Sequence, residues 1–208
     1  MAHANRFDAY SFDPVPQHSH EYISPPLLQA LLRLNVQSVL EIGCGNGSLA
    51  HAMTDAGIQV TGIDPSLCGI EIATRQVPKA TFIQMDAGDD PAQIEETIFD
   101  AVVSSEVIEH LFRPRTLLRL AHLKLRPGGR LLLTTPYHGY AKNFMLSLFN
   151  KWDFHHASHK EGGHIKFWSR KSLTRLLRSE GFDAIHFQGL GRLPFLWKSM
   201  LLIAQKQN

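Results

Sequence analysis

Short apolar runs alternate along the chain with segments in which apolar side chains recur every three or four residues. The apolar runs predict strands at 37–42, 58–64, 80–86, 99–106 and 130–136, and a closing strand pair at about 182–188 and 198–205. The periodic segments predict helices at about 24–34, 47–56, 66–76, 114–125 and 169–180, and a further helix leaving the fourth strand at 104–111. This alternation is typical of an α/β fold with a doubly wound, mostly parallel sheet, here of seven strands.

The alternation is interrupted after the fifth strand. Residues 137–165 are rich in aromatic side chains and histidine and show little periodicity. A chain of 208 residues suffices for one domain with a sizeable core. We therefore expect a single domain over 1–208, in which 137–165 forms an insert or lid on the substrate side.

Composition narrows the class of protein. Hydrophobic residues make up 44% of the chain, which indicates a globular protein. The two cysteines, Cys44 and Cys68, are too few for a disulfide framework. No secretory signal and no apolar run of about 20 residues is visible in the sequence. We expect a reduced, cytoplasmic protein without an integral membrane segment.

Charge is unevenly distributed along the chain. Residues 1–149 contain 11 basic and 15 acidic residues, whereas residues 150–208 contain 10 and 4. A basic C-terminal part favours an anionic partner. Much of this charge falls on the helix predicted at 169–180, where it is also explained as the solvated face opposite the leucines.

A glycine-rich loop follows the first predicted strand. Gly43, Gly45 and Gly47 allow a sharp turn and the close approach of a ligand, and the next helix begins directly after them. Asp64 ends the second predicted strand, where a carboxylate can accept hydrogen bonds from both ribose hydroxyls of a nucleoside.

Two residues in this loop argue against a dinucleotide. Ser48 stands where the dinucleotide pattern G-x-G-x-x-G/A has its last glycine or alanine. Glu41 lies just before the first glycine, where a carboxylate would repel a pyrophosphate. The same carboxylate suits a ligand with an ammonium or sulfonium group.

With these motifs the chain resembles the class I S-adenosylmethionine-dependent methyltransferases, which have a Rossmann-like fold. The resemblance rests on E-x-G-C-G-x-G at 41–47, GID at 62–64, MDA at 85–87 and DAVVSSEVIEHL at 100–111. It implies S-adenosylmethionine as cofactor, with its methionine part near Glu41 and the glycines, its ribose on Asp64 and its adenine on Asp86. The cofactor-binding residues implied by the resemblance are Glu41, Gly43, Cys44, Gly45, Gly47, Asp64, Pro65, Asp86, Ala87 and Ser104.

The stretch SSEVIEHL contains Glu106, Glu109 and His110, which would share one face of the predicted helix. Two neighbouring carboxylates repel each other, and a divalent cation would reverse this effect. The alternative is an ordinary helix start, capped by Ser104 or Ser105.

The stretch also resembles two methyltransferase subfamilies, the ubiquinone-biosynthesis O-methyltransferases and the 3′-terminal 2′-O-methyltransferases of small RNAs. That resemblance implies a later histidine as a further metal ligand, and GGHIKFWSRKSL nominates His164. Mixed oxygen and nitrogen ligands suit Mn²⁺, Co²⁺, Fe²⁺ or Zn²⁺ better than Mg²⁺. The nearby His155, His156 and His159 are interpreted as solvent-facing loop residues.

His138 follows the fifth predicted strand and is the candidate general base, with a polar loop residue as the alternative. The leading hypothesis is O-methylation of a small molecule with vicinal oxygens, such as a catechol-like quinone precursor. Three alternatives stay open: 2′-O-methylation of an RNA 3′ end, methylation of a sugar or glycan intermediate, and S-adenosylmethionine binding without catalysis.

Overall fold

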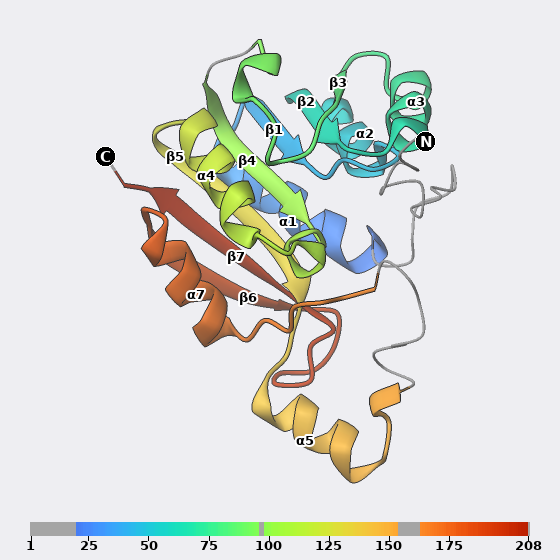
Figure 1. Ribbon diagram of the computed structural model, residues 1–208, viewed down its shortest axis with the longest axis vertical. Coiled ribbons are helices and arrows are strands. Elements are labelled where there is room, and N and C mark those ends of the chain that lie inside the picture. The colour runs from blue at the N-terminus through green and yellow to red at the C-terminus, as the bar shows by residue number, and fades with distance from the viewer. Residues whose placement is uncertain (1–19, 96–97, 154–162, 208) are drawn as a thin grey trace, which may run out of the picture.

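The computed structural model describes residues 20–95, 98–153 and 163–207. Its centre is a seven-stranded sheet with the strand order β3-β2-β1-β4-β5-β7-β6 (Figure 1). The strands are β1 (Ser38–Ile42), β2 (Gln59–Asp64), β3 (Thr81–Gln84), β4 (Phe99–Ser105), β5 (Leu125–Pro136), β6 (Phe182–Leu190) and β7 (Ser199–Lys206). β7 runs antiparallel to β5 and β6, and the pairs among β1 to β5 are parallel. The predicted α/β architecture is confirmed.

Helices cover both faces of the sheet. They are α1 (His20–Arg33), α2 (Ser48–Asp55), α3 (Leu67–Gln76), α4 (Pro114–Lys124) and α7 (Arg170–Ser179), whereas α5 (Tyr140–Leu148) lies beyond the end of the sheet (Figure 1). α4 and α7 share one apolar core with Leu40, Val102 and Leu131. α1 and α2 share the other with the neighbouring Val39 and Val103. Successive residues of a buried strand thus enter opposite cores, which explains the continuous apolar runs in the sequence.

Two element boundaries differ from the sequence-based expectations. α1 begins at His20 and contains Pro25 and Pro26, although proline disfavours a helix interior. Ile23, Leu27 and Leu31 recur every four residues and are all buried, so packing against the sheet offsets that cost. β5 begins at Leu125, directly after α4, with an irregular register beside Phe99.

The prediction of a helix at 104–111 is wrong. β4 ends at Ser105, and the next residue, Glu106, has a left-handed backbone with φ 56°. Its amide donates to the carbonyl of Thr134 at 3.2 Å, which keeps the chain beside β5. Only a short 3₁₀ turn, η2 (Ile108–His110), follows. α4 starts at Pro114, which suits the first turn of a helix.

The insert after β5 contains α5, which projects from the end of the sheet at the bottom of Figure 1. Residues 154–162, which include His155, His156 and His159, lie outside the described residues. Within the described part of the chain, no helix is long and apolar enough to cross a membrane.

Candidate active site and metal-binding cluster

The glycine loop joins β1 to α2 through left-handed backbone conformations. Gly43, Gly45 and Gly47 have φ values of 81°, 51° and 79°, a region that other residues rarely adopt. A Cβ atom on Gly43 would lie 2.3 Å from Cγ2 of Val107. The loop therefore packs directly against the SSEVIEHL segment, and glycine is required at position 43 for space as well as for backbone geometry.

Asp64, at the end of β2, is tied to this loop. Its Oδ2 accepts a hydrogen bond of 2.9 Å from the Gly45 amide, and its Oδ1 accepts one of 2.9 Å from the Ser66 amide. Burial raises the pKa of Asp64, and these two hydrogen bonds oppose the shift. The two hydrogen bonds thus fix the orientation of the carboxylate at the loop.

Glu41 is buried beside the loop. Its Oε2 has no hydrogen-bond partner among the described residues. Burial raises the pKa of Glu41 well above its ordinary value, and the charge of Asp64 raises it further. A buried acceptor without a donor is costly, so this position suits a ligand that carries N–H donors.

The other predicted cofactor residues occupy neighbouring positions. Asp86 follows β3, is half-buried and accepts a hydrogen bond of 2.8 Å from the Gly88 amide. Ser104 is fully buried in β4, and its hydroxyl has no hydrogen-bond partner within the described residues. Cys44 is buried in the glycine loop, whereas Pro65 and Ala87 are half-buried just after Asp64 and Asp86. All of them except Ser104 lie at or just beyond the C-terminal ends of β1, β2 and β3.

Three of the four predicted metal ligands meet in one cluster. One ligand atom each of Glu109, His110 and His164 lies within 4.8 Å of the others. The two imidazole rings are 4.8 Å apart and nearly perpendicular. The carbonyl of Glu109 accepts hydrogen bonds of 2.9 and 3.0 Å from the amides of Ile165 and Lys166, which brings His164 beside η2.

Glu109 is the buried member of the cluster. Thr135 Oγ1 donates a hydrogen bond of 2.9 Å to its Oε2. Its Oε1 lies 3.9 Å from Nε2 of His164 and has no hydrogen-bond partner among the described residues. Burial raises the pKa of Glu109 well above its ordinary value, and the charge of Glu106 adds to this rise. A cation at Oε1 would relieve both effects.

Glu106 lies outside this cluster. Its left-handed backbone directs the side chain toward β7, where Ser199 Oγ donates to Oε2 at 3.2 Å. Burial raises the pKa of Glu106 to about 7, although the hydrogen bonds from Thr134 and Ser199 and the charge of Lys142 oppose the shift. The expectation that Glu106, Glu109 and His110 share a helix face was wrong because no helix forms there.

His138 lies just past β5, at the same end of the sheet. It is buried, its amide donates to the carbonyl of Trp168 at 3.0 Å, and its ring meets the Phe167 ring edge-on with centroids 5.1 Å apart. The segment that carries His164 continues through these two aromatic residues into α7. A backbone hydrogen bond therefore joins His138, just after β5, to the segment that leads from His164 into α7.

Sequence reasoning missed the polar residues that surround Glu106. Ser199 begins β7, and a side-chain hydrogen bond joins it to Tyr22 of α1. Lys142 of α5 is buried, and burial lowers the pKa of its amine to about 8, with a further lowering by Arg192 and an opposing effect of Glu106. Nothing in the sequence marks this lysine, because lysine side chains are almost always exposed.

Comparison with known proteins is consistent with this geometry. A family model described as a methyltransferase domain matches residues 15–186. A ubiquinone biosynthesis O-methyltransferase of Ralstonia nicotianae is 26% identical over 183 residues, which cover 86% of this chain and 76% of that protein. One from Xanthomonas oryzae pv. oryzae is 32% identical over 136 residues, which cover 64% of this chain and 56% of that protein.

Solved structures share the fold. The methyltransferase domain of bacterial CtHen1-CN superposes with a TM-score of 0.67 at 20% identity, over 88% of this chain and 96% of that one. The 1,6-didemethyltoxoflavin-N1-methyltransferase of Burkholderia thailandensis, with 1,6-didemethyltoxoflavin and S-adenosylhomocysteine bound, gives 0.65 at 19% identity, over 89% and 78%. The family match spans most of the chain, so this protein belongs to the methyltransferase domain family and is an S-adenosylmethionine-dependent methyltransferase.

Proposed function

We propose that this enzyme O-methylates a small molecule with two vicinal oxygens, with the help of a divalent cation held by Glu109, His110 and His164. The observation that carries the proposal is the meeting of these three side chains around a buried carboxylate oxygen that has no hydrogen-bond donor among the described residues. Mixed oxygen and nitrogen ligands favour Mn²⁺, Fe²⁺, Co²⁺ or Zn²⁺ over Mg²⁺. The names of the relatives, ubiquinone biosynthesis O-methyltransferases, support O-methylation of a quinone precursor.

The cofactor site that we propose lies beside this cluster. Glu41 would accept hydrogen bonds from the ammonium group of S-adenosylmethionine, and Asp64 would bind the ribose hydroxyls. Asp86 and Ala87 would contact the adenine, and Ser104 would border the cofactor on the acceptor side. The unusual backbone of the glycine loop supports this arrangement because it lets a ligand approach the main chain closely.

The residues around the acceptor then have distinct roles. When bound, S-adenosylmethionine would supply an electrophilic methyl group, and a cation held by the three ligands would make an acceptor hydroxyl more acidic. Thr135 fixes the orientation of Glu109, and Glu106 adds negative charge next to it. His138 would accept the hydroxyl proton as the oxygen–methyl bond forms and the sulfur–methyl bond breaks. The main contribution of the protein is alignment of the two reacting groups.

Calorimetric titration of Mn²⁺ into the enzyme with S-adenosylhomocysteine bound tests the metal site. We expect one site in the wild type, no detectable binding to Glu109→Gln and unchanged binding to Glu71→Gln, which alters an exposed glutamate of α3. The absence of Mn²⁺ binding to the wild type would contradict the proposal. A screen of catechols, diols and sugars then identifies the acceptor, and the absence of any turnover would favour a non-catalytic binding protein.

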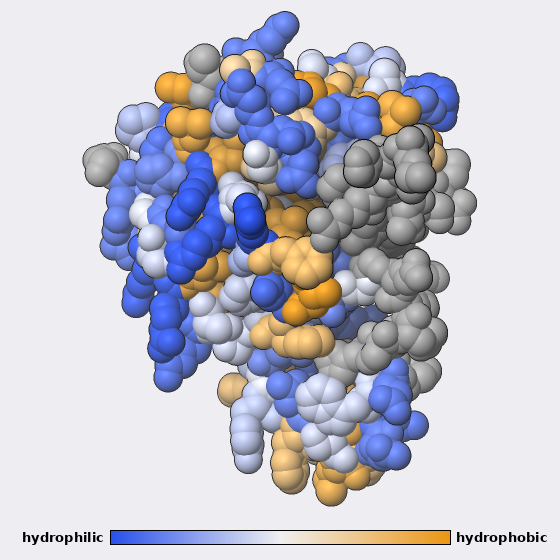
Figure 2. All heavy atoms as spheres, viewed as in Figure 1, coloured by the Kyte–Doolittle hydropathy of each residue, from blue (hydrophilic) through white to orange (hydrophobic). Residues whose placement is uncertain are grey.

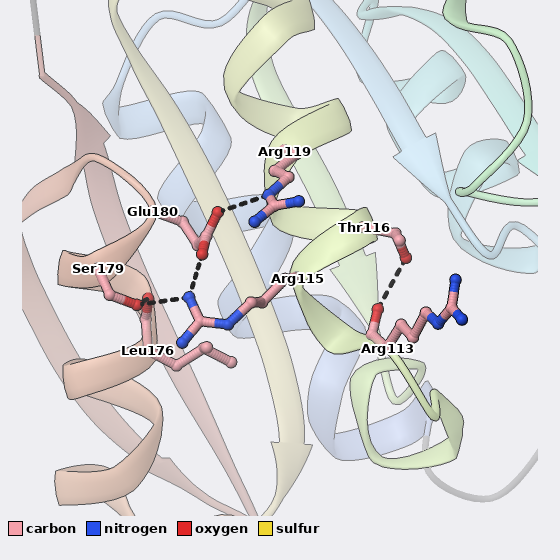
Figure 3. A network of polar contacts seen from close by, with 7 residues as sticks. All are labelled: Arg113, Arg115, Thr116, Arg119, Leu176, Ser179 and Glu180. Carbon is pink, nitrogen blue, oxygen red and sulfur yellow. Dashed lines mark hydrogen bonds and ion pairs between the residues drawn. The ribbon is translucent and has the colours of Figure 1, made fainter.

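RNA is the second candidate acceptor because α4 and α7 present a basic surface. Figure 2 shows a strongly hydrophilic surface over α7. Arg115 and Arg119 of α4 both contact Glu180 at the end of α7 (Figure 3). Around these two helices, the exposed basic residues that make no ion pair with a described carboxylate are Arg113, Arg170, Lys171, Arg175 and Arg178.

Binding of a short single-stranded RNA distinguishes the two acceptor classes. An RNA substrate would bind with an affinity that falls steeply as salt concentration rises, because cationic side chains release counterions from phosphates. Charge reversal of Arg175 and Arg178 would then weaken binding. Salt-independent methylation of a catechol, with no RNA binding, would favour the small-molecule function.

A further inference from the structure

The insert helix α5 has an unusual distribution of side chains. All nine of its residues are described, and the buried one is Lys142. Most of its large apolar residues are instead exposed, with Tyr140, Phe144 and Leu148 at 86%, 53% and 62% of their full exposure, and Leu146 is half-buried. Figure 2 shows hydrophobic side chains at this end of the molecule. Burial of apolar surface therefore does little to hold α5 against the sheet.

Lys142 instead connects α5 to two strands. Its ammonium group donates hydrogen bonds to the carbonyl oxygens of Tyr137, at 2.9 Å, and Lys198, at 3.4 Å. Tyr137 follows β5 and Lys198 precedes β7, and the Tyr137 amide also donates to the Lys198 carbonyl at 3.1 Å. Glu106 attracts the same ammonium group electrostatically. One side chain thus joins the insert to the sheet edge beside Glu106.

The acceptors of these hydrogen bonds are themselves well fixed. The Tyr137 ring meets the rings of Trp197 and Phe187, with centroids 5.1 and 6.2 Å apart. A buried ammonium group is costly unless it is hydrogen-bonded, so Lys142 remains buried only while α5 is docked. Loss of the docked position would expose the amine and break both bonds together.

We propose that Lys142 is a positioning residue that holds α5 at the edge of the sheet, so that the helix forms one wall of the acceptor site. The location of the acceptor at this edge rests on the proposed function. The hydrogen bonds between Lys142 and the two strands do not depend on it. In the sequence, His138 lies between Tyr137 and Lys142, the two residues that one of these hydrogen bonds joins.

Hydrogen exchange measured by mass spectrometry on the full chain, with S-adenosylhomocysteine bound, tests the connection. We expect Lys142→Met to increase exchange of the 140–149 amides about tenfold while β1 to β5 are unchanged. Lys142→Arg keeps hydrogen-bond donors and should restore much of the protection. Lys151→Met is the matched control, because Lys151 is exposed just after α5, and it should exchange like the wild type. Unchanged exchange of α5 in Lys142→Met, or an equal increase in the central strands, would overturn the proposal.

Kinetics with 3,4-dihydroxybenzoate as a catechol probe test the role in acceptor binding. Lys142→Met should raise KM about tenfold and change kcat much less, with unchanged affinity for S-adenosylhomocysteine. Lys142→Arg should give an intermediate KM. An unchanged KM despite faster exchange would show that α5 does not form a wall of the acceptor site. If the wild type methylates no catechol, the proposed small-molecule function fails, and hydrogen exchange alone decides whether Lys142 holds the helix.

Discussion

The hydroxyl group of Thr135 donates a hydrogen bond of 2.9 Å to Oε2 of Glu109, which leaves Oε1 toward His164. A hydrogen bond of this kind orients a metal-binding carboxylate, and its loss typically weakens metal affinity 10- to 100-fold. We therefore expect Thr135→Val, which keeps the shape of the side chain, to weaken Mn²⁺ binding at least about tenfold in calorimetry. Thr116→Val, on α4, is the control. Equal Mn²⁺ affinity in Thr135→Val and wild type would show that the hydroxyl group does not support the site.

The raised pKa of Glu106 predicts a pH-dependent stability. With a folded pKa of about 7 and an unfolded value of 4.5, the folded protein binds a proton that the unfolded chain has lost between these pH values. The contribution of Glu106 to the free energy of unfolding therefore falls as pH rises from about 4.5 to about 7 and is constant above that range.

Glu106→Gln removes this contribution. We expect its melting temperature relative to wild type to rise between pH 4.5 and 7.5 in metal-free buffer, measured by thermal unfolding. Glu71→Gln, on the exposed side of α3, should show no such trend. A difference between Glu106→Gln and wild type that stays constant across this range would contradict the raised pKa.

Substitution of Asp64 is expected to weaken cofactor binding. Both of its oxygens accept hydrogen bonds from backbone amides, so the NH₂ group of an asparagine would face a donor at one of them. We expect Asp64→Asn to weaken S-adenosylhomocysteine binding by about tenfold or more in calorimetry, a loss of about 1.4 kcal/mol. Asp183→Asn, on the exposed side of β6, should bind like the wild type. Normal affinity in Asp64→Asn would exclude the proposed ribose contact.

Alanine substitutions at Gly43 and Gly57 distinguish the cost of backbone strain from the cost of a steric clash. Both have a left-handed backbone, with φ values of 81° and 84°, but a Cβ on Gly57 would meet no atom within 4 Å. Alanine at position 57 should cost about 1–2 kcal/mol of stability from the backbone alone. Gly43→Ala adds the clash with Val107 and should therefore have a lower melting temperature than Gly57→Ala. Similar melting temperatures would mean that the loop moves away from Val107 at little cost.

The sheet and the glycine loop were predictable because both have strong local signals. Buried parallel strands leave continuous apolar runs, and a sharp turn after β1 requires glycine. The turn after β4 was not predictable in the same way. A spacing of three and four residues between Glu106, Glu109 and His110 suits a helix, but the contact with Thr134 over a long sequence separation sets the backbone instead. Local spacing carries no information about that contact.

Contacts that depend on the insert were the least predictable. His164 was nominated by resemblance to known families, and the structure places it beside Glu109 through backbone hydrogen bonds that no side-chain pattern encodes. Lys142 was not identified at all, because its burial depends on the carbonyl groups of Tyr137, just after β5, and Lys198, just before β7. The cofactor roles of Glu41 and Asp64 stay predictions, to be tested by the binding measurements above.

The position of β7 has a consequence for the order in which the protein assembles during translation. Of the seven strands described here, β7 is synthesised after the other six, yet it lies between β5 and β6 in the sheet. Ser199 and the Lys198 carbonyl, which contact Glu106 and Lys142, arrive with it. The glycine loop and Asp64 are synthesised much earlier, and nascent chains generally fold from the N-terminal side. The half of the enzyme that contains the predicted cofactor loop can thus form on the ribosome before the half that orders α5 exists.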